Sequence, residues 1–202
     1  AIGLAIHPAM TFTGLSMDLQ RLNGTSFAVT GPAPFLPIAQ ALVVEMGGEP
    51  VHVAEADRAL YHAALAHASN HLVTILGQAQ QMLASIGIED PAHYMGPLVR
   101  AAVDNALASG EGALTGPVAR GDAGTVAAHM RALGEYAQGE KTGDITDSYA
   151  ALAHATAKRA HNRGLLNDEQ LERIESLVEP SANVEYTGDT DDSAPENKEF
   201  SS

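Results

Sequence analysis

Cysteine and tryptophan are absent from this 202-residue chain, and aromatic residues make up only 4% of it. Without cysteine the chain can form no disulfide, no thiolate nucleophile and no cysteine-ligated zinc site. Hydrophobic residues nevertheless make up 45%, which is enough for one ordinary domain or two small ones. Because aromatic residues are so scarce, alanine and leucine must fill the core, which favours closely packed helices.

Basic residues are also scarce, with 11 Lys and Arg against 25 Asp and Glu, for a formal net charge of -14. Such an acidic surface repels phosphate backbones and anionic membranes, so nucleic-acid and membrane partners are not expected. No apolar run reaches the roughly 18 to 20 residues that span a bilayer. The start of the chain lacks the basic region of a signal peptide. We therefore expect a cytoplasmic protein.

The two ends of the chain carry further expectations. The chain begins without Met in what resembles a strand, so we expect that an upstream portion precedes it. Residues 179–202 are acidic and have almost no periodic apolar residues, which predicts a disordered acidic tail.

The first 55 residues have an α/β pattern. Short apolar runs predict a buried strand at residues 1–7 and further strands at 26–30 and 51–53, with a helix at about 32–46 before the third. Three strands and one helix are too little sheet to stand alone comfortably. Residues 1–55 are therefore predicted to be part of a larger α/β domain.

From residue 56 the pattern is helical. Asp90 and Asp122 are good N-caps, and Asn167 with Gln170 resembles a capping box. These signals and the glycine breaks predict helices at 57–86, 91–110, 122–136, 145–162 and 168–178. The predicted fold is therefore mostly α, with a helical domain at residues 56–178.

His7 and Pro8 end the first predicted strand. Ligands of open α/β sheets bind outside the carboxyl ends of strands, where a histidine could act as an acid near neutral pH. The structural alternative is a histidine that bonds only to a loop carbonyl.

The long predicted helix carries Tyr61, His62, Ser69 and Asn70. His62 and Ser69 lie about 20° apart on a helical wheel and Asn70 about 80° from His62, so they form one polar stripe and its flank. Such residues need partners when buried, and either a site facing another domain or hydrogen bonds between helices would provide them.

His67 and His71 have the i, i+4 spacing that can bind a metal. No glutamate stands beside His67, and no third ligand lies at a recognised spacing. A solvated or subunit-facing surface is therefore expected, with no metal site.

The loop T-G-P-V-A-R-G-D covers residues 115–122. Gly116 and Pro117 indicate a turn, and Arg120 is a strong anion binder. The structural alternative is that Asp122 only caps the next helix and that Arg120 pairs with it. The segment G-E-G-A-L-T-G at 110–116 follows a helix and has the wrong final spacing for a dinucleotide fingerprint.

Three segments together resemble a family of Rossmann-like proteins with a helical C-terminal domain of formerly unknown function, distantly related to the 6-phosphogluconate dehydrogenase superfamily. The segments are H-P-A-M-T-F (7–12), Y-H-A-A (61–64) with A-S-N (68–70), and A-L-T-G-P-V-A-R-G-D (113–122). The resemblance runs from residue 1 to about 160 and lacks the family's front half. It implies that residues 1–55 are the C-terminal part of a Rossmann-like domain. It also implies a 6-phosphogluconate-dehydrogenase-C-terminal-like helical domain at residues 56–178 and a homodimer formed through that domain.

The resemblance also implies an NAD(P)-dependent oxidoreductase similar to ketopantoate reductase and pyrroline-5-carboxylate reductase. In the related hydroxyacid dehydrogenases a lysine stands four residues before an asparagine; here Asn70 fits the asparagine position, but Ala66 stands at the lysine position. His62 or His7 would then replace the lysine as proton donor. NADP or NAD is expected to bind only the full-length protein.

The main hypothesis is therefore a reductase of a small oxo acid, ketopantoate first, or of an imine. The expected roles are catalytic for His7, His62 and Asn70, substrate-binding for Ser69, Thr115, Arg120 and Asp122, and cofactor-binding for Pro8. The alternative is a non-catalytic helical module for dimerisation or ligand sensing. Convergence of these residues on one cleft favours the enzyme, and scatter favours the module. Metal-dependent hydrolysis through the histidines is the weakest hypothesis.

Overall fold

The computed structural model describes residues 3–139 and 143–179. The chain divides into two compact units, residues 1–98 and 99–202. The predicted domain boundary at residues 55–56 falls inside the first unit, where strands give way to helices. Apart from Glu179, the predicted acidic tail lies outside the described residues.

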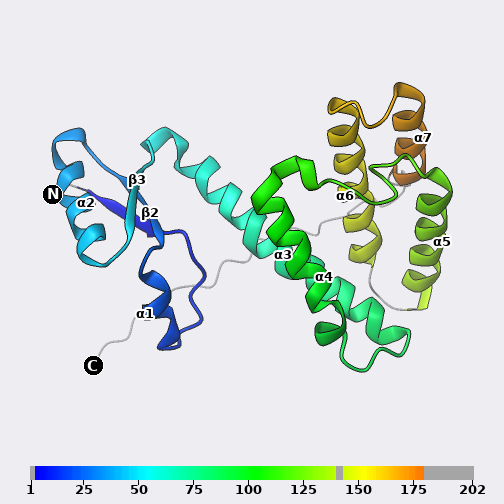
Figure 1. The fold of residues 1–202 in the computed structure, drawn as a ribbon, viewed down its shortest axis with the longest axis horizontal. Helices are drawn as coiled ribbons and strands as arrows, with labels where there is room; N and C mark the ends of the chain where they lie inside the picture. The colour runs from blue at the N-terminus through cyan, green and yellow to red at the C-terminus, as the bar shows by residue number, and fades with distance from the viewer. Residues whose placement is uncertain (1–2, 140–142, 180–202) are drawn as a thin grey trace, which may run out of the picture. The chain divides into compact units, whose positions relative to one another are not determined.

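A three-stranded mixed sheet forms the first part of the first unit (Figure 1). Its strands, in the order in which they pair, are β1 (Ala5–Pro8), β2 (Ser26–Thr30) and β3 (Glu49–His52). β1 is antiparallel to β2, and β2 is parallel to β3. β1 is partly exposed rather than buried as predicted, because within the described sheet it pairs on one side only. Such an edge position also admits Pro8.

The two faces of the sheet have different roles. Phe27 and Val29 point to one face and are buried against Ala39 and Val43 of helix α2 (Leu36–Glu45). Successive side chains of a strand point to opposite faces. The register pairs Ala5 with Thr30 and His7 with Ala28, so these four residues share the face away from α2. That face carries the candidate site.

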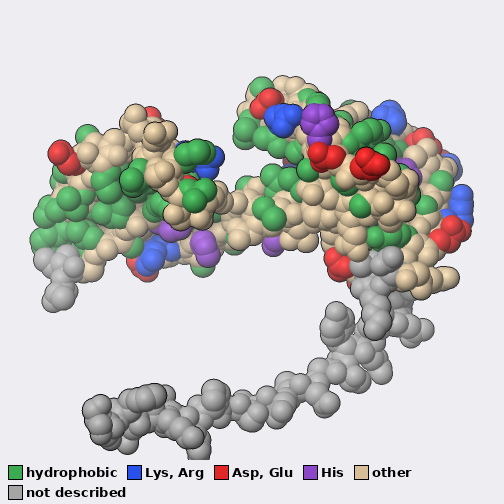
Figure 2. All heavy atoms as spheres, turned by 90° about the horizontal axis from the view of Figure 1, so that it is seen from below, with side chains coloured by type: hydrophobic (Ala, Val, Ile, Leu, Met, Phe, Trp, Pro, Cys, Tyr) green, Lys and Arg blue, Asp and Glu red, His purple; other side chains and the backbone are tan. Residues whose placement is uncertain are grey.

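Helix α2 is apolar on its outer side as well as on its inner side. Figure 2 shows hydrophobic side chains gathered on the part of the first unit that carries the sheet and α2. The large exposed ones of α2 are Ile38, Leu42 and Val44, which are 55%, 52% and 62% exposed. A helix that is apolar all round is typical of one covered by further protein.

A short helix that the sequence did not predict, α1 (Met17–Leu22), precedes β2. Asp18 is only 5% exposed and holds the loop before this helix. Its carboxylate accepts hydrogen bonds from the backbone N–H groups of Thr13 at 2.7 Å and Gly14 at 2.9 Å. Burial alone would raise the pKa of Asp18, but these hydrogen bonds outweigh burial and lower it.

Two long helices follow the sheet. Short 3-10 turns lead into α2 and α3, and the elements are η1 (Ala33–Phe35), η2 (Glu55–Asp57), α3 (Arg58–Ser85) and α4 (Pro91–Ser109). Gly87 has a φ of +91° and ends α3 by directing its N–H to Ala84. Asp90 caps α4 by accepting from the N–H of His93 at 3.0 Å. Both predicted helices are confirmed within a residue or two at each end.

The second unit contains three helices that pack together (Figure 1). After η3 (Gly110–Ala113), they are α5 (Ala123–Gly139), α6 (Gly143–Asn162) and α7 (Asp168–Val178). Their core contains Val126, Ile174 and the buried alanines of α6 at positions 150, 153, 157 and 160. The predicted capping box of Asn167 and Gln170 is present. The mostly α fold with a small Rossmann-like sheet is therefore confirmed.

Candidate functional site

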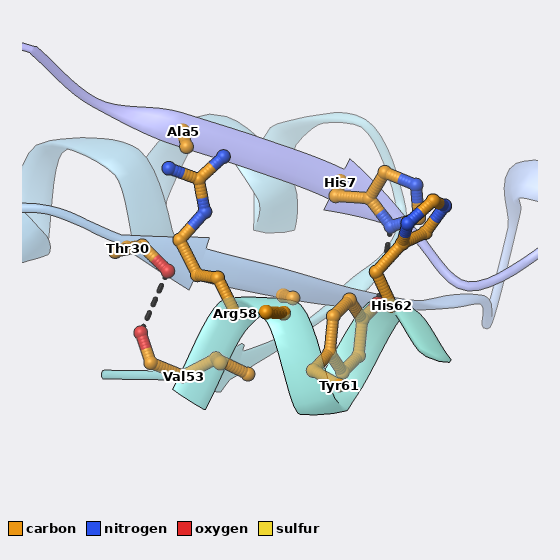
Figure 3. Close-up of a pocket in the computed structure, with 9 residues that line it drawn as sticks. Ala5, His7, Thr30, Val53, Arg58, Tyr61 and His62 are labelled. Atoms are coloured by element: carbon orange, nitrogen blue, oxygen red, sulfur yellow. Dashed lines mark hydrogen bonds between the residues drawn. The ribbon is translucent and has the colours of Figure 1, made fainter. Parts of the chain in front are cut away.

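The centre of the candidate site is a contact between His7 of β1 and two neighbouring residues of α3 (Figure 3). The His7 Nδ1 atom lies 3.1 Å from the Tyr61 hydroxyl oxygen, and the His7 and His62 ring centroids lie 6.0 Å apart. Two segments more than 50 residues apart in the chain thus bring two imidazoles and a phenol together. All three groups can carry a transferable proton.

Tyr61 is suited to orient the His7 ring. Burial raises the pKa of Tyr61 above its ordinary value, so the hydroxyl is protonated at neutral pH. A phenol can donate to an unprotonated imidazole nitrogen and accept from a protonated one, so the contact persists in either tautomer. The second nitrogen of His7 then faces away from Tyr61 and is available to a ligand.

His7 and His62 line two neighbouring hollows, which we together call the histidine groove. The first, which we call the arginine hollow, has a volume of about 400 Å³ and is lined by Ala5, His7, Ala28, Thr30, Val53, Arg58, Ala59, Tyr61 and His62. The second, the asparagine hollow, has a volume of about 410 Å³ and is lined by His7, Ala9, Met10, Thr11, His62, Leu65, Ala66, Ala68, Ser69 and Asn70. Neither lining includes a carboxylate.

Four of the predicted site residues, His7, His62, Ser69 and Asn70, line the asparagine hollow. Ala66, which occupies the position of the family's lysine, lines the same hollow. His62 lies one helical turn before Ala66 and lines the same hollow.

The remaining predicted residue of the first unit, Pro8, is the last residue of β1. It lies opposite Phe27 in the sheet register and is not part of either lining. Its predicted contact with a cofactor stays a prediction.

Three predicted residues, Thr115, Arg120 and Asp122, belong to the second unit. Asp122 caps α5 by accepting from the N–H of Thr125 at 3.0 Å and from its hydroxyl at 2.7 Å. These hydrogen bonds lower the pKa of Asp122 despite a smaller opposing effect of burial, and the charge of Arg120 lowers it further. The capping role of Asp122 is confirmed, whereas binding of substrate by these three residues stays a prediction.

The His67 and His71 pair lies on the exposed surface of α3. The two Nδ1 atoms are 2.9 Å apart. Within residues 3–139 and 143–179, no group of three or more His, Asp or Glu side chains is arranged to hold a metal ion. No described helix is long and apolar enough to cross a membrane.

Two residues of the site had no role in the sequence prediction. Arg58 stands at the N-terminus of α3 and lines the arginine hollow, and Thr30 lines it from β2. The i, i+4 spacing of Arg58 and His62 is a signal that could have identified the arginine. Thr30 gives no comparable signal, because its position depends on the pairing of β1 with β2.

A dinucleotide needs a glycine-rich turn between a strand and a helix, where backbone N–H groups bind the pyrophosphate. In the described part of the chain, the turn from β2 to α2 carries only Gly31. A Cβ at Gly31 would lie 2.6 Å from the Leu4 side chain, so packing already explains this glycine. These residues do not fit a pyrophosphate.

Comparison with known proteins gives a family and a fold. Residues 25–156 match the model of a domain of unknown function, DUF2520. The crystal structure of protein TM1727 from Thermotoga maritima is similar, with a TM-score of 0.66 and 26% sequence identity. The alignment covers 80% of this chain and only 62% of the Thermotoga chain. No curated protein matches the sequence.

Proposed function

We propose that this chain, which belongs to the DUF2520 family, is the substrate-binding and proton-donating portion of an NAD(P)-dependent oxidoreductase. The substrate class is a small oxo acid, with ketopantoate as the first candidate, or a related imine. The observation that carries the proposal is the convergence of His7, Tyr61 and His62 on one groove that Ser69 and Asn70 also line.

The groove offers the groups that reduction of a carbonyl requires from a protein. When bound, the nicotinamide cofactor supplies the hydride, and the protein supplies orientation and a proton donor. An imidazolium of His62 or His7 would donate its proton to the carbonyl oxygen, which becomes the hydroxyl of the product. The amide of Asn70 and the hydroxyl of Ser69 would hold that oxygen by hydrogen bonds.

Because the turn from β2 to α2 does not fit a dinucleotide's pyrophosphate, the cofactor would bind mainly outside the described residues. Two observations support this part of the proposal. The chain aligns with only 62% of the Thermotoga protein, and the outer face of α2 exposes apolar side chains that further protein would cover.

The test is steady-state oxidation of NADPH and NADH with a panel of 2-oxo acids and cyclic imines. It compares the 202-residue chain with the longest form of the protein that its gene encodes. Loss of a general acid lowers the rate by about 100- to 10,000-fold, so the His7→Gln, His62→Gln double variant should lose at least about 100-fold in kcat. The single variants identify the donor.

His93→Gln is the matched control, because His93 is an exposed histidine of the same unit that lines neither hollow. It should keep the wild-type rate. Turnover by the double variant at the wild-type rate would exclude both histidines as proton donors, and failure of every oxo acid and imine in the panel would remove the proposed reaction.

A second candidate, a non-catalytic dimerisation module, is supported by the surfaces of α3 and α4. No residue of α3 is buried. Leu60, Val73, Leu98 and Leu107 of these helices are 74%, 70%, 74% and 83% exposed. Exposed apolar side chains in such number are typical of association surfaces. A homodimer is compatible with either function, and absence of turnover together with dimerisation would favour the module.

A further inference from the structure

Arg58 and His62 form one row of the arginine hollow, and Ala5 and His7 form the other. Arg58 precedes His62 by one helical turn, so both side chains leave the same face of α3. Ala5 precedes His7 by two residues and shares its face of β1. Figure 3 shows the Arg58 guanidinium reaching toward β1 near Ala5, and His62 lying beside His7.

The two rows have nearly the same spacing. Four residues of an α-helix rise about 6 Å and two residues of a strand about 6.6 Å. A ligand that lies between β1 and α3 can therefore contact the guanidinium at one end and the histidines at the other. The arrangement provides one anion-binding end and one proton-donating end.

The charges of the hollow favour an anion. The whole chain has 25 acidic and 11 basic residues, yet the arginine hollow is lined by one arginine, two histidines and no carboxylate. The Thr30 hydroxyl already donates to the carbonyl oxygen of Val53 at 2.6 Å. Arg58 is therefore the strong donor of this hollow, and its planar fork matches a carboxylate.

The Arg58 guanidinium forms an ion pair with Glu55. The Nη1 atom lies 3.0 Å and 3.4 Å from the two carboxylate oxygens of Glu55. Both side chains are well exposed, at 50% for Arg58 and 76% for Glu55. Exposed pairs of this kind contribute little to stability. A ligand carboxylate can therefore replace Glu55 as the partner of Arg58 with only a small loss of folding stability.

We infer that Arg58 binds the carboxylate of the substrate and so restricts the groove to anionic carbonyl compounds. This inference rests on the proposed function, because that function places the reacting carbonyl at His7 and His62. It assigns the role of carboxylate anchor, which the sequence suggested for Arg120, to an arginine in the same unit as the histidines.

The test measures dissociation constants by ligand-observed NMR titration of the 202-residue chain, without cofactor. The probes are 2-oxoisovalerate, its uncharged counterpart 3-methyl-2-butanone, and inorganic pyrophosphate. The proteins are wild type, Arg58→Gln, Arg58→Lys, Glu55→Gln and the control Arg100→Gln, which removes the same charge from an exposed position of α4.

We expect wild type to bind the oxo acid at least tenfold more tightly than the ketone. Arg58→Gln should lose about tenfold or more in oxo-acid affinity, in line with the loss of a hydrogen bond to a charged group, and should leave ketone binding unchanged. The oxo-acid affinity of Arg58→Lys should lie between those of wild type and Arg58→Gln. Glu55→Gln should bind the oxo acid more tightly than wild type, and Arg100→Gln should have the wild-type affinity.

The inference would be overturned by no measurable binding of the oxo acid to wild type, by equal affinity of wild type for acid and ketone, or by an oxo-acid affinity of Arg58→Gln equal to that of wild type. If Arg58-dependent binding of pyrophosphate were stronger than that of the oxo acid, Arg58 would be a phosphate-binding residue, and this result would also overturn the inference. Because the titration needs no turnover, an inactive protein that still shows Arg58-dependent binding would refute the proposed reaction and leave this assignment intact.

Discussion

Gly48, in the turn between α2 and β3, tests the packing that holds the candidate site in place. A Cβ at this position would lie 2.4 Å and 2.5 Å from two ring carbons of Phe27 and 3.0 Å from the carbonyl oxygen of Thr25. Phe27 is only 3% exposed and belongs to the core of the first unit. Because the ring has no free space and the carbonyl is backbone, Gly48→Ala should overpack the core and destabilise it by about 1–3 kcal/mol.

The assay is hydrogen exchange followed by mass spectrometry, which reports the local stability of each segment. A loss of about 1–3 kcal/mol corresponds to roughly 5- to 150-fold faster exchange, and we expect it in peptides covering residues 25–53. Peptides from α5, α6 and α7 belong to the other unit and should exchange at the wild-type rate, which provides an internal control.

Gly77→Ala is the matched control, because Gly77 lies in the exposed middle of α3 and no atom lies within 4 Å of its added Cβ. Alanine is the better helix former by about 1 kcal/mol, so α3 should exchange about fivefold more slowly. If Gly48→Ala left exchange in residues 25–53 unchanged or slowed it, the described contact between Phe27 and the β3 turn would be wrong.

Two further predictions concern the loop before α1 and the surface of the long helices. A lowered pKa means that Asp18 stabilises the folded loop above its unfolded pKa, near 3.9, and that this stability is lost as the pH falls through the folded pKa. The Thr13 and Gly14 amide signals should therefore weaken below about pH 4 in wild type, whereas Asp18→Asn should show a weakened loop at all pH values; equal acid sensitivity of both proteins would contradict this role. Sedimentation equilibrium should show a wild-type dimer and a Val73→Glu, Leu107→Glu monomer; a monomeric wild type would exclude the dimer.

Much of the fold follows from signals that are local in the sequence. Pro91 and Gly110 delimit α4, and the caps at Asp90, Asp122 and Asn167 are formed by side chains within three residues of their partners. α1 has no comparable signal, because it is only six residues long. It depends on the Asp18 carboxylate, whose partners lie in an irregular loop.

The site was partly predictable for the same reason. The polar stripe of His62 and Ser69 follows from helical periodicity alone, and both residues line the same hollow. The spacing of Arg58 and His62 could have indicated that Arg58 lies on the same stripe of α3, but the hollow that both line also depends on which face of β1 carries His7. That face is set by the antiparallel register of β1 with β2, which is a tertiary property.

The central claim is that the histidine groove binds a small oxo acid. The most direct test follows the Cε1–H signals of the nine histidines during titration of the chain with 2-oxoisovalerate. The account predicts that the signals of His7 and His62 move together and saturate at one concentration, while those of His129, His154 and His161 in the second unit stay in place. Saturable movement confined to second-unit histidines, or no movement of His7 and His62, would contradict it.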